Sequence, residues 1–228
     1  MGDQRGYWDK VAHEKSFTLP FDHSNFSTYM KKEDAILDIG CGYGRIVHEL
    51  DQNGYTNLTG IDFSERMIQR GKQLYPDLNL LTGGGEALPF PGASFDAAIL
   101  FAVITGNYRS EDQIRLIQNI WDTLKPGGII AVNDFLLNDD QRNLDRYAYY
   151  QETYGLYGVF ELPDGGVVRH HTREWIKELL RNFTQLHYAE TEFTTMNGNI
   201  SKGFVYLGRK PGQRYLNEIT RFGHLLGK

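Results

Sequence analysis

Short apolar runs alternate with helix-like segments along most of the chain, and this alternation constrains the fold more than any other feature. Each run holds apolar and β-branched residues bounded by Gly, Asp or Pro, as expected for strands buried on both faces of a sheet. The five runs are AILDIG (35–40), NLTGIDF (57–63), LNLLTG (78–83), FDAAILFAV (95–103) and GGIIAVNDF (127–135). Because parallel neighbours need a crossover connection, strands that alternate with helices predict a doubly wound, mostly parallel α/β sheet.

Helix signals fill the gaps between these runs. Ser64, Ser110 and Thr172 each precede a segment whose apolar residues have helical spacing, and they are predicted N-caps. Toward the C-terminal end the pattern changes, because two strand-like runs flank Asn-Gly at 197–198, the strongest short signal for a hairpin. An antiparallel pair is therefore predicted at the far edge, which gives a seven-stranded, Rossmann-like sheet.

The segment from Leu136 to His170 has no place in the alternation and is too long for an ordinary connection. We expect it to form a helical cap over the sheet. No internal repeat or low-complexity linker divides the chain. The predicted organisation is one domain over 1–228, with a cap insertion at 136–170 and an N-terminal lid at 1–30.

Composition argues against several classes of partner. The net charge is -5 and the Lys and Arg residues are scattered, so no nucleic-acid partner is predicted. No apolar run approaches the ~18 residues of a membrane helix, and the N-terminus lacks the apolar core of a secretory signal, so we expect a cytoplasmic protein with no membrane partner. The single cysteine, Cys41, excludes an intramolecular disulfide, and the chain has no HExxH or CxxC spacing, so no metal is predicted. The sequence leaves the oligomeric state open.

The stretch DIGCGYGR (38–45) directly follows the first apolar run. Its three glycines, at alternate positions, permit positive φ and let a ligand touch the main chain at the end of the sheet where ligands bind. The dinucleotide fingerprint is GxGxxG, whereas here Arg45 takes the place of the last glycine. A carboxylate at Asp38 repels a pyrophosphate but suits a cation. The stretch therefore favours a nucleoside that carries a positive charge over a dinucleotide.

A second acid, Asp62, ends the next apolar run in GIDFS. A carboxylate at that position accepts hydrogen bonds from both hydroxyls of a ribose, as it does in dinucleotide enzymes, so it supports a nucleoside without deciding which one. The alternative role, an N-cap for the next helix, is already served by Ser64. We therefore predict a ligand contact for Asp62.

Four motifs together resemble those of the class I S-adenosylmethionine-dependent methyltransferases, and within them the small-molecule group typified by ubiquinone-biosynthesis-like enzymes. The motifs follow one another at the family's usual separations, and the resemblance spans 35–135. They are LDIGCGYG (37–44), GIDFSERMI (60–68), EALPFPGASFDAAIL (86–100) and LKPGGIIAV (124–132). The resemblance implies S-adenosylmethionine as the cofactor and methyl transfer as the activity.

The resemblance also implies cofactor-binding roles, residue by residue. The three glycines would wrap the methionine part of the cofactor, with Asp38 near its ammonium group, and Asp62 would hold the ribose. The adenine ring would pack on Phe63 and Met67, with its edge toward Glu86 and Ala87. The predicted cofactor-binding set is Asp38, Gly40, Gly42, Gly44, Asp62, Phe63, Met67, Glu86, Ala87 and Phe101.

One position departs from the family. Relatives usually carry an acid two residues before the Glu86 position, where it accepts a hydrogen bond from the adenine amino group, and this chain has Gly84 there. Another group, or water, must make that bond, or it is not made. Two alternatives to a methyltransferase stay open: a nicotinamide-dependent oxidoreductase, which Arg45 and Asp38 disfavour, and a non-catalytic interaction protein that keeps the fold.

Methyl transfer requires few catalytic groups from the protein. A methyl group on a sulfonium already has a good leaving group, so holding a nucleophile in line with it supplies most of the rate. A general base is needed only when the nucleophile arrives protonated. We therefore predict in-line displacement by an O, N or C atom of a small molecule or short peptide, and the catalytic residue stays unknown.

Substrate residues are expected outside the four motifs, in the N-terminal segment, the loop after the fourth run and the cap. Three cap tyrosines share one helical face. They either pack the cap on the domain or line the pocket, and in the pocket they favour an aromatic or cationic substrate. The predicted substrate-binding set is Tyr7, Trp8, Tyr108, Tyr147, Tyr150 and Tyr154.

A charged run, Arg169-His170-His171, precedes the last helix. Either histidine is a possible base near neutral pH, and Arg169 is a possible partner for a substrate carboxylate. Such residues more often cap a helix or form a solvated turn, so none of the three is predicted to be catalytic.

Overall fold

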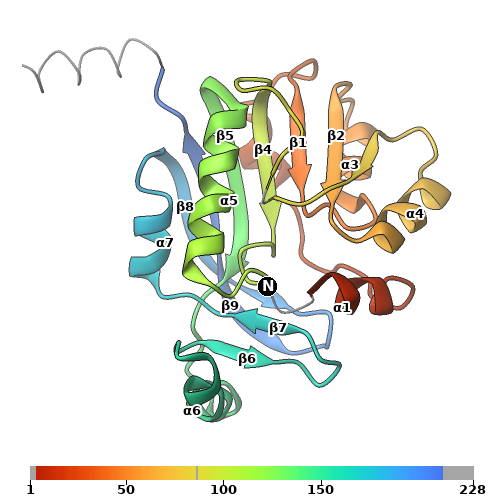
Figure 1. Ribbon diagram of the computed structural model, residues 1–228. Helices are drawn as coiled ribbons and strands as arrows, with labels where there is room; N and C mark the ends of the chain where they lie inside the picture. Colours follow the sequence, from red (N-terminus) through yellow and green to blue (C-terminus); the bar gives the residue numbers. More distant parts are fainter. Residues whose placement is uncertain (1–3, 86, 213–228) are drawn as a thin grey trace, which may run out of the picture.

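The structure is a computed structural model that describes residues 4–85 and 87–212. Its centre is a seven-stranded sheet with the order β3-β2-β1-β4-β5-β9-β8 (Figure 1). The strands of this sheet are β1 (Ile36–Ile39), β2 (Leu58–Asp62), β3 (Leu80–Thr82), β4 (Phe95–Phe101), β5 (Leu124–Phe135), β8 (Thr184–Thr194) and β9 (Ile200–Arg209). Strands β1 to β5 run parallel, whereas β9 pairs antiparallel with both β5 and β8. The predicted doubly wound sheet with an antiparallel C-terminal hairpin is confirmed.

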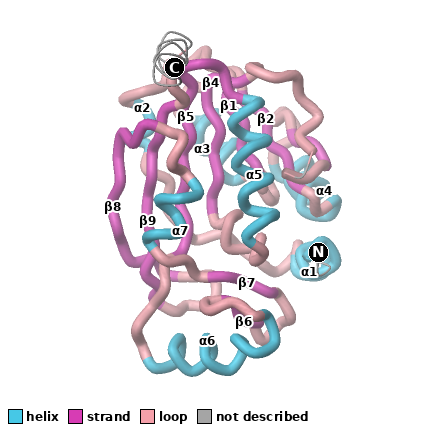
Figure 2. The backbone as a smooth tube through the Cα atoms, turned by 60° about the vertical axis from the view of Figure 1, so that its left-hand side comes forward, coloured by secondary structure: helices cyan, strands magenta, loops and turns pink. Residues whose placement is uncertain are grey.

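Helices cover both faces of this sheet (Figures 1 and 2). Apolar residues of α5 and α7 pack on one face, and those of α2 and α3 pack on the other. The helices are α1 (Gln4–Val11), α2 (His23–Ser27), α3 (Arg45–Gln52), α4 (Glu65–Leu74), α5 (Ser110–Thr123), α6 (Gln141–Tyr154) and α7 (Arg173–Leu179). None of these helices has the length and apolar character needed to cross a bilayer, within the part of the chain that the structure describes.

Two of the three predicted N-caps are confirmed. The hydroxyl of Ser64 accepts the N–H of Met67 at the start of α4, and Thr172 does the same for α7. The prediction for Ser110 is wrong: Arg109 holds the N-cap position of α5 without a side-chain bond, and Ser110 is the first helical residue. The hydroxyl of Ser110 instead accepts a hydrogen bond of 3.0 Å from the buried guanidinium of Arg169, which no local pattern announces.

The segment 136–170 forms α6 and a small antiparallel pair, β6 (Val159–Glu161) with β7 (Val167–Arg169). It lies beyond the carboxyl ends of the parallel strands, at the bottom of Figure 2. A bridge joins Leu136, the first residue of the segment, to His171, the residue that follows it. The segment predicted to form a helical cap therefore contains one helix and one short antiparallel pair.

The N-terminal segment lies at the same end of the sheet, beside α4 (Figure 1). The hydroxyl of Tyr7 donates to Asp164 at 3.0 Å, and Lys15 forms an ion pair of 2.6 Å with the same carboxylate. Arg70 of α4 donates to the carbonyls of Ala12 and Lys15 at 2.7 Å. The segment is thus tied both to α4 and to the turn between β6 and β7.

Candidate functional site

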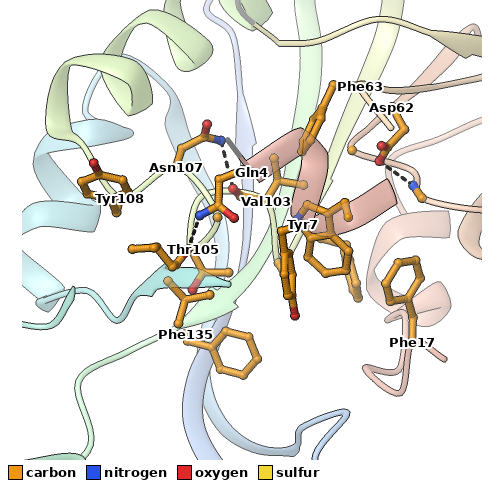
Figure 3. A pocket seen from close by; sticks show the side chains of 18 of the residues that line it. Gln4, Tyr7, Phe17, Asp62, Phe63, Val103, Thr105, Asn107, Tyr108 and Phe135 are labelled. Carbon is orange, nitrogen blue, oxygen red and sulfur yellow. Dashed lines mark hydrogen bonds between the residues drawn. The ribbon is translucent and has the colours of Figure 1, made fainter. Parts of the chain in front are cut away.

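A cavity of about 770 Å³ opens where the parallel strands end (Figure 3). Its wall includes the last residues of β1, β2 and β4, the N-terminal segment and part of the segment 136–170. This is the end of an open parallel sheet at which ligands bind. The cavity therefore lies where the glycine stretch predicts a ligand.

Gly40 and Gly42 line the cavity, and both have the positive φ, +69° and +56°, that favours glycine. A Cβ on Gly40 would lie 2.6 Å from Val103, and one on Gly42 would lie 2.2 Å from the ring of Phe17. Gly44 does not line the cavity. It occupies the N-cap of α3 with φ +83°, so its part is to let the chain turn into the helix.

Asp62 lines the cavity and holds the glycine stretch in place. Its Oδ2 accepts the N–H of Gly42 at 2.8 Å (Figure 3). Its Oδ1 accepts the N–H of Ser64 at 2.8 Å. Burial raises the pKa of this carboxyl to about 6, against the opposing effect of the two main-chain donors. Each oxygen keeps a second lone pair, so the carboxylate has capacity left for hydroxyl donors from a ligand.

Asp38 is 2% exposed at the end of β1 and also lines the cavity. No group among the described residues donates a hydrogen bond to its carboxyl. The nearby guanidinium of Arg45 is the main group that favours the charged form of Asp38. Burial outweighs that effect and raises the pKa of Asp38 to about 8. A buried carboxyl with no hydrogen-bond donor is costly to ionise, so the site favours a ligand that brings a positive charge.

Three of the four residues predicted to lie around the adenine line the cavity. Phe63, Met67 and Ala87 line it, as does Phe101 at the end of β4, whereas Glu86 lies outside the described residues. Gly84 lines the cavity too, so backbone stands where relatives carry an acid.

The predicted substrate residues divide into two groups. Tyr7, Trp8 and Tyr108 line the cavity, whereas the three tyrosines of α6 do not. Tyr154 packs edge-on against Tyr108 at 5.3 Å between ring centroids and donates to Glu161, and Tyr150 packs beside Tyr154.

Tyr147, on α6, is fully buried. Its hydroxyl lies 2.6 Å from Nδ1 of His170, and it also accepts the N–H of Asn138 at 3.2 Å. His170 itself lines the cavity, 5% exposed, with its ring stacked on Phe135. Tyr147 therefore reaches the cavity only through His170.

His171 and Arg169 support a loop and do not line the cavity. Nδ1 of His171 lies 3.1 Å from the carbonyl of Phe135, and Nε2 lies 2.9 Å from the amide nitrogen of Gln113. That amide nitrogen also donates to the carbonyls of Ile104 and Asn107, in the loop after β4. Burial lowers the pKa of His171 to about 3, so the ring is a neutral part of the scaffold.

Several residues that line the cavity were not predicted from the sequence. They come from the loop after β4, from the segment 136–170 and from the turn between β8 and β9: Thr105, Asn107, Arg142, Arg146, Phe160, Thr195, Met196, Asn197 and Asn199. The β8–β9 turn is held near the N-terminal segment by hydrogen bonds from Lys15 to Asn197 and from Thr18 to the carbonyl of Thr194. These pairs are more than 170 residues apart, so no spacing in the sequence signals them.

Comparison with known proteins yields a consistent set of relatives. A family model described as a methyltransferase domain matches residues 36–128. O-methyltransferase resE of Aspergillus sclerotiorum is 25% identical over 215 residues, which are 90% of this chain and 75% of that protein. The 27-O-demethylrifamycin SV methyltransferase of Amycolatopsis mediterranei is 31% identical over 140 residues, 58% of this chain and 50% of that protein. The crystal structure of a SAM-dependent methyltransferase from Methanosarcina mazei has a TM-score of 0.79 and 28% identity, and covers 86% of this chain and 100% of that chain. The similarity thus extends beyond the four motifs to most of the chain.

Proposed function

We propose that the chain is a class I S-adenosylmethionine-dependent methyltransferase, an enzyme that uses S-adenosylmethionine as its cofactor, and on that premise we propose what it methylates and how. The acceptor is an O, N or C atom of a small molecule or short peptide, and the methyl group moves by in-line displacement. One relative is named an O-methyltransferase and the other is named a methyltransferase of 27-O-demethylrifamycin SV, which supports an oxygen atom of a small molecule. The narrower assignment to the ubiquinone-biosynthesis-like group stays a prediction.

One observation carries the cofactor end of this proposal. Two buried carboxylates, Asp38 and Asp62, flank two backbone positions without side chains, Gly40 and Gly42, on one wall of the cavity. Such a wall fits a nucleoside with a cationic amino-acid tail. The glycine backbone permits close approach, Asp38 suits the positive charge, and Asp62 can accept hydrogen bonds from the ribose hydroxyls.

We assign the cofactor contacts accordingly. Asp38 binds the ammonium group, Asp62 binds the ribose hydroxyls, and Phe63 and Met67 pack on the adenine. Ala87 faces the adenine edge, a role that the sequence also predicts for Glu86, and Phe101 packs against the cofactor from β4. Gly44 contributes through the start of α3.

The chemistry that this cofactor supplies is a methyl group on a positively charged sulfur, ready to be displaced. The protein's own part is to align the acceptor atom and exclude water, which is worth about 7 to 11 kcal/mol when the geometry is right. We propose that the N-terminal segment (1–30) acts as a lid and that 136–170 acts as a cap for this purpose. The ion pair between Lys15 and Asp164, which joins the two segments, supports that division. Tyr7, Trp8 and Tyr108 would contact the acceptor.

Calorimetric titration tests the cofactor assignment directly. We expect micromolar binding of S-adenosylmethionine and S-adenosylhomocysteine and no binding of NADH. Binding of NADH alone would indicate an oxidoreductase, and absence of all three signals would leave a non-catalytic interaction protein. Transfer of a labelled methyl group to a small organic acceptor then tests the activity.

A further inference from the structure

The cap end of the cavity is positively charged. From the segment 136–170, two arginines, Arg142 and Arg146, line the cavity and no acid does. The acids on the cavity wall, Asp38 and Asp62 at the glycine stretch and Asp112 on α5, come from the domain below. Three arginines, Arg5, Arg45 and Arg115, line that part of the wall as well, so the cap end is the part of the cavity where positive side chains stand without acids.

Arg146 is held in place without a negative partner. Its Nη2 donates to the amide oxygen of Asn143, and its guanidinium lies 3.4 Å from the ring centroid of Phe160. It forms no ion pair among residues 4–85 and 87–212, and its buried Nε has no hydrogen-bond partner there. Asp140 is the one carboxylate that raises the pKa of Arg146, and its effect is the smallest among the groups that shift that pKa. Burial lowers the pKa of Arg146 to about 10, which reflects a charge removed from water without full compensation.

His170, close to Arg146, presents a second donor. Asn138 accepts the N–H of Lys202 through Oδ1, which fixes its amide nitrogen toward Nδ1 of His170 at 3.3 Å. The hydroxyl of Tyr147 approaches the same nitrogen at 2.6 Å. That hydroxyl also lies 3.3 Å from Oδ1 of Asn143, so it has two acceptors to choose from, whereas the amide nitrogen of Asn138 can only donate. Nδ1 therefore accepts from Asn138, and the proton of the neutral ring lies on Nε2, which has no partner among the described residues. His170 therefore offers an N–H to the cavity.

Aromatic rings flank this pair of donors. Phe160 lies under Arg146 and packs edge-on against His170 at 4.9 Å between ring centroids. Phe135 stacks on His170 at 5.5 Å, and both phenylalanines line the cavity. Both side chains offer apolar surface against which a flat ring in the cavity can pack, and a carboxylate on that ring suits the guanidinium and the imidazole N–H.

On the proposed function, we propose that the methyl acceptor is an aromatic carboxylate whose anionic group is bound by Arg146 and His170. The anion gives the guanidinium of Arg146 the negative partner that the described residues do not supply. The ring packs against Phe135 and Phe160, with the atom to be methylated toward the glycine stretch. The proposal differs from the sequence-based expectation of an aromatic or cationic acceptor held by the tyrosines of α6.

The cofactor also carries a carboxylate, so the source of the anion must be distinguished. Arg45 lies close enough to Asp38 to be the main group that favours the charged form of that acid, and its buried Nε is also without a partner. It therefore serves the amino-acid end of the cofactor. Arg146 lies instead on the cap, with Phe160 and His170.

The test is calorimetric titration of the protein saturated with S-adenosylhomocysteine, using 1-naphthoate and 1-naphthamide as matched probes. We expect the acid to bind at least tenfold more tightly than the amide, because only the acid makes charge-assisted hydrogen bonds. Arg146→Met keeps an unbranched side chain on Phe160 and should reduce this preference to within twofold. Arg146→Lys keeps the positive charge without the paired N–H donors of the guanidinium, and it should retain part of the preference for the acid. Arg181→Met, at an exposed ion pair with Glu178, is the matched control and should keep it in full.

Each outcome bears on the proposal. Equal affinity for acid and amide, or binding of neither probe, overturns it. So does a tenfold loss of S-adenosylhomocysteine affinity in folded Arg146→Met, since Arg146 would then bind the cofactor. If the wild-type protein does not bind S-adenosylhomocysteine at all, the proposed function itself fails, and the two failures are thereby told apart.

Discussion

Asp62 and Gly42 are joined by a hydrogen bond of 2.8 Å, from the main-chain N–H of the glycine to Oδ2 of the carboxylate. The other oxygen of Asp62 accepts the N–H of Ser64 at the same distance. The side chain of Asp62, at the end of β2, therefore fixes both the N-cap residue of α4 and the glycine stretch that follows β1. The residue predicted to bind the ribose is also the one that shapes the wall beside it.

Asp62→Ala should weaken both binding and folding. Losing two hydrogen bonds to ribose hydroxyls, at about 1.5 kcal/mol or more each, should lower S-adenosylmethionine affinity at least tenfold. Two buried N–H groups lose their acceptor as well, so the free energy of unfolding should fall by about 1 to 3 kcal/mol. Calorimetry and urea denaturation measure the two effects. Asp77→Ala, at an exposed turn, is the control, and an unchanged affinity in Asp62→Ala would remove Asp62 from the cofactor site.

Asp38→Asn should make the protein more stable and bind its cofactor less tightly. Because burial raises the pKa of Asp38 to about 8, the native state keeps a proton that the unfolded state has lost between pH 4 and 8. The contribution of Asp38 to stability is therefore greatest in acid and is lost as pH rises through that window. At pH 8 the amide should add on the order of 1 kcal/mol, about 2 to 4 °C in melting temperature. A melting temperature that drops would contradict this account.

Cofactor binding should release a proton from Asp38 near neutral pH. An ammonium group beside this carboxyl favours the ionised form, so the pKa of Asp38 falls on binding. Titration of wild type at pH 7 in two buffers of different ionisation enthalpy should report net proton release, and Asp38→Asn should show none. Release of the same size in both proteins would place the titrating group elsewhere.

Gly42→Ala should cost more than another substitution at positive φ. Gly42 and Gly54 both have positive φ, +56° and +83°, so alanine carries a backbone cost of about 1 to 2 kcal/mol at either position. Only at Gly42 would the new methyl meet a ring, that of Phe17 at 2.2 Å, whereas nothing lies within 4 Å at Gly54. Gly42→Ala should therefore lose cofactor affinity as well as stability, while Gly54→Ala should lose stability alone.

A double-mutant cycle separates the clash from the backbone strain. Adding Phe17→Ala to Gly42→Ala should restore the part of the stability loss that exceeds that of Gly54→Ala. If the two substitutions are additive, Phe17 does not limit the space at Gly42.

His170 should stay neutral, with its proton on Nε2. Burial and the charge of Arg146 lower the pKa of this ring well below its usual value, so it should not take up a proton between pH 8 and 5.5. The unfolded state does take up that proton, so the stability that His170 contributes is present above about pH 6.5 and declines as the pH falls below it. Two-dimensional NMR of the imidazole nitrogens should show a protonated Nε2 and an unprotonated Nδ1. A proton on Nδ1, or a midpoint near pH 6.5, would contradict the arrangement with Tyr147 and Asn138.

Local signals in the sequence determined the frame of the protein. Apolar runs long enough for a strand, the serine before α4 and the Asn-Gly turn each act over a few residues, and the structure has a strand, an N-cap and a hairpin at those places. The acids at Asp38 and Asp62 follow two strands that are neighbours in the sheet, so their meeting at one edge follows from the parallel topology.

Only the tertiary structure decided what the cap brings to the cavity. Helical periodicity indicated that Tyr147, Tyr150 and Tyr154 share a face, but a period does not say what that face meets, and the cavity is lined instead by Arg146 and His170. The hydroxyl of Ser110 likewise binds Arg169, 59 residues away, rather than its own helix. Such choices depend on which buried polar and charged groups find partners once distant segments pack together. That depends on the folded chain as a whole, and no short stretch of sequence records it.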